Sequence, residues 1–147
     1  MGNAFRGDDA AGLEVAGLLA GTLPDGVGLL EREGEPTSLI DSWEGAEAVW
    51  LVDAVSSGAP AGTVHRLDAG VEELPRELFH ASTHAFGLAE AVELARALGR
   101  LPARTIVFGI EGARFEAGDE LSAAVGGAAR EVAAALRKEV AACTSRR

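Results

Sequence analysis

The sequence is poor in cysteine, in basic residues and in long apolar runs. Cys143 is the single cysteine, so the chain can form neither an internal disulfide nor a cluster of thiolate metal ligands. In a polar tail this thiol is a poor candidate nucleophile. The longest apolar runs, AVWLV and TIVF, are far too short to cross a bilayer. We therefore expect no signal peptide, no membrane partner and a cytoplasmic location.

The scarcity of basic residues argues against nucleic acid as a partner. Thirteen Lys and Arg residues stand against 23 Asp and Glu residues, which gives a net charge of −10. An acidic surface repels phosphate backbones. The only basic clusters are Arg137-Lys138 and Arg146-Arg147, both near the C-terminus.

Several common catalytic motifs are also missing. The sequence has no GxSxG elbow, no P-loop and no GxGxxG turn, which argues against serine hydrolases, P-loop nucleotide hydrolases and dinucleotide enzymes. His80 and His84 lie in HASTH, which lacks the glutamate of a zincin helix, so a zinc pair there is not favoured.

The 147 residues are 48% apolar, which is enough for one packed domain. We assign this domain to residues 1–142 and expect residues 143–147 to fray. Hydrophobic periodicity predicts helices over 8–21, 36–45, 83–99 and 119–140, and strands over 26–35, 48–55, 62–69 and 104–112. This order predicts an α/β fold, a three-layer α/β/α sandwich around a twisted, mostly parallel sheet. The continuous apolar run AVWLVDAV is typical of a central strand covered on both faces.

The beginning of the chain raises a question of its own. MGNAFRGDDAAG reads as a glycine turn that leads into a helix headed by acids, and such a turn normally follows a β-strand. No strand precedes it here. Either the fold tolerates the loss of this strand, or the true start codon lies upstream.

Ligands of parallel sheets gather at the carboxyl ends of the strands, and this rule selects two carboxylate positions. Asp53 ends the run AVWLVD, where it can belong to a site or cap the next turn through Ser56-Ser57. Asp8 and Asp9 stand at the head of the first helix. One of them can cap that helix, which leaves the second free to face a cleft.

One imidazole is expected at the same edge. His84 lies at the head of a predicted helix, in ASTHAFG, where it can be a ligand or an ordinary surface or core residue. His65 alternates within a strand and is interpreted as structural or exposed. Two carboxylates and one imidazole suit a borderline divalent metal with open coordination positions.

Four stretches in register resemble the hydrogenase maturation proteases: GNAFRGDDAAG, LVDAV, STHAFGLAEAVELARALGRLP and FGIEG. The resemblance runs from Gly2 to about Leu136. It implies an endopeptidase that removes the C-terminal extension from the precursor of a nickel–iron hydrogenase large subunit. It also implies that Asp9, Asp53 and His84 face a cleft and meet nickel that the precursor already carries, as catalytic and metal-binding residues. No permanently bound cofactor is expected.

The chain departs from the family pattern in lacking the first strand, which ends in Gly-x-Gly-Asn in family members. Met1 stands where valine is common, so a valine codon read as an initiator would produce this beginning. Two alternatives therefore stay open. One is a hydrolase with its own zinc or manganese at Asp9, Asp53 and His84, and the other is an inactive binding module that grips the hydrogenase subunit without cutting it.

Overall fold

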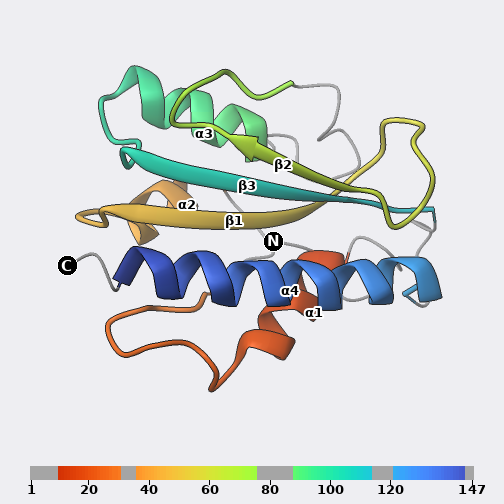
Figure 1. Ribbon diagram of the computed structural model, residues 1–147. Coiled ribbons are helices and arrows are strands. Elements are labelled where there is room, and N and C mark those ends of the chain that lie inside the picture. Colours follow the sequence, from red (N-terminus) through yellow and green to blue (C-terminus); the bar gives the residue numbers. More distant parts are fainter. Residues whose placement is uncertain (1–9, 31–35, 76–87, 114–120, 145–147) are drawn as a thin grey trace.

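In the computed structural model, the described residues are 10–30, 36–75, 88–113 and 121–144. The elements in this part of the chain are α1 (Ala11–Leu19), α2 (Pro36–Ser42), β1 (Ala48–Val55), β2 (Val64–Asp68), α3 (Leu88–Ala97), β3 (Arg104–Glu111) and α4 (Ala123–Thr144). Each of them falls within or close to a range predicted from hydrophobic periodicity (Figure 1).

The sheet has the strand order β1-β3-β2. β1 and β3 are parallel, in register from Ala48 opposite Arg104 to Val55 opposite Glu111. β2 is the shorter strand and runs antiparallel to β3, with Val64 opposite Ile110. The longer pairing is thus the parallel one. It places the carboxyl ends of β1 and β3 at the same edge of the sheet, where β2 begins.

Helices cover both faces of the sheet, as Figure 1 shows. α1 and α4 pack on one face, and α2 and α3 pack on the other. This arrangement confirms the predicted three-layer α/β/α sandwich. Within the described helices, none has the length and apolar character needed to cross a membrane.

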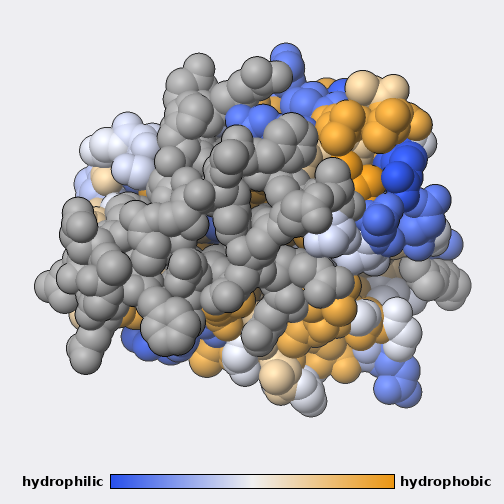
Figure 2. All heavy atoms as spheres, turned by 180° about the vertical axis from the view of Figure 1, so that it is seen from behind, coloured by the Kyte–Doolittle hydropathy of each residue, from blue (hydrophilic) through white to orange (hydrophobic). Residues whose placement is uncertain are grey.

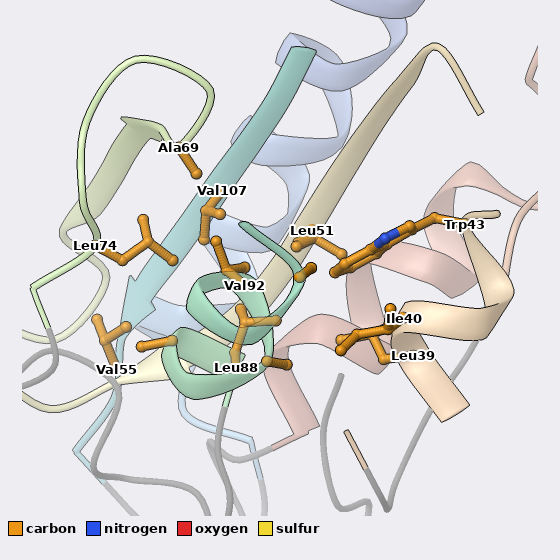
Figure 3. Close-up of a cluster of buried hydrophobic side chains, with 13 residues drawn as sticks. Leu39, Ile40, Trp43, Leu51, Val55, Ala69, Leu74, Leu88, Val92 and Val107 are labelled. Carbon is orange, nitrogen blue, oxygen red and sulfur yellow. The ribbon is translucent and has the colours of Figure 1, made fainter. Parts of the chain in front are cut away.

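One hydrophobic cluster fills the space between the sheet and the α2–α3 layer (Figure 3). Leu51 of β1 and Val107 of β3 point from the sheet toward Leu88 and Val92 of α3. Trp43, just after α2, packs into the same cluster, and its indole N–H donates a hydrogen bond to the carbonyl of Arg100, 3.0 Å away. This bond satisfies the polar atom of a side chain that is only 4% exposed.

A second cluster lies between the sheet and the α1–α4 layer. The alternation along β3 divides its side chains between the two faces, because successive residues of a strand point in opposite directions. Ile106, Phe108 and Ile110 enter this cluster, whereas Val107 enters the first. This double coverage explains why β3 reads as a nearly continuous apolar run.

Two predictions about strands need correction. The predicted strand over 26–35 does not form at residues 26–30, and its remainder lies outside the described residues. β1 was expected to be central, but β3 takes that position in the described sheet and β1 lies at its edge. The apolar character of AVWLVDAV matches coverage by helices on both faces, and periodicity alone cannot say which strand has neighbours on both sides.

A groove of about 490 Å³ runs along the side of β1 that faces away from β3. Its lining is mostly apolar and comes from α1, the segment after it, the end of α2, the first part of β1 and the end of α4. Leu29 and Leu30 contribute to this lining and are exposed. Figure 2 shows hydrophobic surface in the lower half of the molecule, the half that holds α1 and the following segment in Figure 1.

Candidate functional site

The edge of the sheet where β1 and β3 end brings together three polar side chains: Asp53, His65 and Glu111. Asp53 lies opposite Gly109 of β3, and the same glycine lies opposite His65 of β2. Glu111 is two residues further along β3. Because side chains on one face recur every second residue, all three belong to the face that α3 covers.

Asp53 is the predicted site residue that the structure describes. Its side chain is 3% exposed, and its Oδ1 atom accepts a hydrogen bond of 2.9 Å from the backbone N–H of Ala54. Burying a carboxylate is costly unless it is paired or hydrogen-bonded. The aspartate therefore lies where the parallel-sheet rule places a site residue, at the carboxyl end of a buried strand.

The predicted alternative, in which Asp53 caps the next turn through Ser56-Ser57, is wrong about the carboxylate, because Ser57 in this turn is bound by Glu111. Both polar hydrogens of Ser57 go to Glu111 of β3. The backbone N–H donates to Oε2 at 3.1 Å, and the hydroxyl donates to Oε1. A side chain of the neighbouring strand β3 thus stabilises the turn after β1.

Glu111 is the most deeply buried acid of the site, with 1% of its surface exposed. Besides Ser57, its Oε1 atom meets Nε2 of His65 at 2.9 Å. Its backbone is also anchored, because its N–H donates to Thr63 and its carbonyl accepts from Gly62. The glutamate therefore fixes both ends of the segment that connects β1 to β2.

The environment of Glu111 favours its ionised form. Burial alone would raise the pKa of this carboxyl, but the hydrogen bonds from Ser57 and the interaction with His65 outweigh burial, so that the net pKa is lowered. At neutral pH Glu111 is a carboxylate, which can only accept hydrogen bonds.

Ser57, Glu111 and His65 do not form a nucleophilic triad. In a triad the imidazole lies between the hydroxyl and the carboxylate. Here the carboxylate of Glu111 lies between the Ser57 hydroxyl and the His65 ring. The Ser57 proton thus goes to a carboxylate that already has other donors, so this arrangement does not activate the serine as a nucleophile.

Several predicted residues lie outside the described part of the chain. Asp8, Asp9, His80 and His84 are among them, so the structure does not report on the proposed set of Asp9, Asp53 and His84. For α1, the N-cap position is taken by Ala10, which makes no side-chain cap hydrogen bond. Within the described residues, no group of three or more His, Cys, Asp or Glu side chains is arranged to hold a metal ion.

Glu111 was missed as a site residue although a signal for it was present. It follows the apolar run TIVFGI, just as Asp53 follows AVWLV, so an acid at the end of a buried strand marks both positions. From the sequence, the alternation around His65 predicts a structural or exposed residue. Its side chain is 24% exposed and it pairs with Glu111, a partner that only the antiparallel register of β2 on β3 reveals.

Comparison with known proteins gives a consistent result. The profile of the hydrogenase maturation protease family (HycI) matches residues 19–139. The hydrogenase maturation protease HybD from Thermococcus kodakarensis is similar in structure, with a TM-score of 0.74, 28% identity, and coverage of 95% of this chain and 94% of the other.

Two further solved structures share the fold. A hydrogenase 2 maturation peptidase from a Thaumarchaeota archaeon has a TM-score of 0.66 and 28% identity, with coverage of 95% of this chain and 93% of the other. HybD from Escherichia coli, at 21% identity, has a TM-score of 0.71 and covers 94% of this chain and 89% of its own. Among curated proteins, none matches the sequence.

Proposed function

This chain belongs to the hydrogenase maturation protease family, and on that premise we propose that it removes the C-terminal extension from the nickel-loaded precursor of a nickel–iron hydrogenase large subunit. The structural observation that supports this proposal most strongly is the position of Asp53. It is a buried carboxylate at the carboxyl end of β1, opposite a glycine of the neighbouring parallel strand. Ligands of parallel sheets bind at that edge.

Nickel is part of the substrate in this proposal. Asp9, Asp53 and His84 together offer two carboxylates and one imidazole, a donor set that suits a borderline divalent ion and leaves coordination positions for the substrate's own ligands. A shared ion holds the protease beside the scissile peptide bond and so supplies proximity. The ion also polarises the scissile carbonyl or the attacking water.

Recognition of the nickel ion ensures that cleavage follows nickel insertion. Removal of the extension serves maturation only after nickel has been inserted, so a protease that binds through nickel discriminates loaded from unloaded precursor. A peptide sequence alone cannot report this difference. We therefore expect the purified protease to bind the nickel-free precursor weakly and to leave it uncut.

The test is a processing assay with two forms of the precursor, one loaded with nickel and one without it. Intact-mass spectrometry reads out the length of the large subunit. We expect shortening of the loaded form alone. If neither form is shortened, the protease assignment is wrong, and if both are shortened at equal rates, the nickel-recognition part is wrong.

A further inference from the structure

The pairing of His65 with Glu111 has no role in the proposed nickel set. A buried carboxylate that meets a partly exposed imidazole is a costly arrangement to place at a sheet edge, because an apolar pair would fill the same space without desolvating a charge. Groups of this kind cluster at functional sites.

The hydrogen bonds of Glu111 fix the tautomer of His65. The backbone N–H of Ser57 can only donate, so Oε2 is an acceptor, and Oε1 faces both the Ser57 hydroxyl and the His65 ring. An ionised carboxylate requires Nε2 of the neutral imidazole to carry the proton. Nδ1 is then the unprotonated nitrogen, able to accept a proton. In the described part of the structure, no hydrogen bond to Nδ1 is formed.

His65 and Asp53 lie in one row across the sheet, separated by a residue without a side chain. Gly109 pairs with both of them, so their backbones are two strand spacings apart, roughly 9–10 Å. A Cβ atom at this position would lie 2.8 Å from a methyl group of Val55. Any larger residue there would therefore force the Val55 side chain or the backbone of β3 to shift.

Within the described residues, few charged groups lie near the His65 imidazole. Glu111 of β3 contacts it, and Asp53 of β1 shares its row. The connection from Ser56 to Thr63 contains no titratable side chain. The surface of α3 that packs on this face is apolar, with Leu88, Ala91, Val92 and Ala95 buried. Among the described residues, Glu111 is thus the charged group in contact with the ring.

We propose that His65 is the general base of the peptidase reaction, held in its reactive tautomer by Glu111. Nδ1 takes a proton from the attacking water as its oxygen bonds to the scissile carbonyl carbon. When the C–N bond breaks, the imidazolium returns this proton to the leaving nitrogen, so the sum of the steps is peptide plus water giving an acid and an amine. Glu111 is a positioning residue in this scheme, because it acts through His65.

This inference rests on the proposed protease function, and the experiment separates the two. The first step is cleavage of the nickel-loaded precursor by the unmodified protein, followed by His65→Gln. Gln can still donate to Glu111 but accepts no proton. We expect kcat to fall by about 10²–10⁴-fold with KM nearly unchanged.

Two further variants distinguish a catalytic role from a structural one. Glu111→Gln keeps an oxygen that can accept from Ser57 but removes the carboxylate that requires a proton on Nε2, so kcat should fall while KM stays nearly unchanged. A purely structural Glu111 would lower the melting temperature and leave kcat of the folded protein unchanged. The matched control is Arg66→Gln, the next residue of β2, which pairs with Glu139 on the opposite side of the sheet. It should keep kcat within about twofold.

A measurement on the unmodified protein removes any dependence on how the variants fold. Nitrogen-15 NMR of the histidine rings at neutral pH should show His65 protonated at Nε2 and unprotonated at Nδ1. The opposite tautomer would overturn the proposal. So would full kcat in His65→Gln, and that result would leave the protease assignment standing. If the unmodified protein cuts no precursor, the protease assignment fails and the catalytic role of His65 fails with it.

Discussion

Nε2 of His65 lies 2.9 Å from Oε1 of Glu111, although 46 residues separate the two in the sequence. Their contact joins the start of β2 to the end of β3. The pairing makes stability depend on pH in a definite direction. A carboxyl group whose pKa is lowered by folding stabilises the folded state above its ordinary pKa and loses this contribution as the pH falls through the lowered value.

The first prediction follows from this sign. The pKa of Glu111 is lowered from an ordinary value of 4.5, because the hydrogen bonds from Ser57 and His65 outweigh the effect of burial, which alone would raise it. Urea unfolding at neutral pH and at several values below 4.5 should show a steeper loss of stability for the unmodified protein than for Glu111→Gln. Parallel curves for the two proteins would contradict the prediction.

Asp53→Asn and His84→Ala should each reduce processing of the nickel-loaded precursor by at least about 10²-fold, because each removes a proposed ligand of the shared ion. Asp53→Asn is nearly isosteric, so the fold should persist, as circular dichroism can verify. Asp68→Asn, at the other end of β2, is the matched control and should process normally. Unimpaired processing by both site variants would remove these residues from the mechanism.

Metal content separates the proposed protease from a hydrolase with its own ion. If nickel comes with the substrate, protein purified without added metal should contain no stoichiometric zinc, manganese or nickel by mass spectrometry of the elements. A stoichiometric ion that is lost together with activity in Asp53→Asn would favour the hydrolase instead.

Arg137 connects the two helices on one face of the sheet. Its guanidinium donates to the carbonyl of Leu18 at 2.7 Å and to the hydroxyl of Thr22 at 3.1 Å. Arg137→Met should therefore lower the free energy of unfolding by about 1–2 kcal/mol, measured in urea. Lys138→Met changes the exposed neighbouring side chain and should stay within about 0.5 kcal/mol of the unmodified protein. Equal effects of the two variants would argue against the role given to Arg137.

Two glycine substitutions should change the stability of the fold in opposite directions. Gly99 ends α3 with a φ of +69°, and the N–H groups of Gly99 and Arg100 donate to Arg96 and Ala95, so Gly99→Ala should cost about 1–2 kcal/mol. Gly17 lies inside α1, and an added methyl group there would enter open space, so Gly17→Ala should add about 0.5–1 kcal/mol. Thermal melts of both variants test the pair, and a change of the same sign in both would refute it.

The elements of this fold were largely predictable because their signals are local. Helix α4 shows its buried face at Val125, Val132, Leu136 and Val140, a periodicity that only a helix produces. β3 has a continuous apolar run in its sequence, because helices cover both of its faces. The strand expected over 26–35 rested on weak alternation, and residues 26–30 form no strand in the structure.

The candidate site was less predictable because its contacts are not local. The position of Asp53 could be inferred from one strand, since a carboxylate after an apolar run marks the edge of the sheet. The pairing of Glu111 with Ser57 and His65 depends on the register of three strands, and no single stretch of sequence contains that register. An acid at the end of β3 was nevertheless visible, and giving it the same weight as Asp53 would have pointed to it.

The apolar groove beside β1 has a consequence for handling the protein in solution. No strand of the described sheet lies beyond β1, and the groove next to it is rimmed by the exposed side chains of Leu29 and Leu30. A strand edge next to a hydrophobic surface can pair through its backbone N–H and C=O groups with a strand of another molecule. Concentrated samples should therefore self-associate first along this side of the sheet.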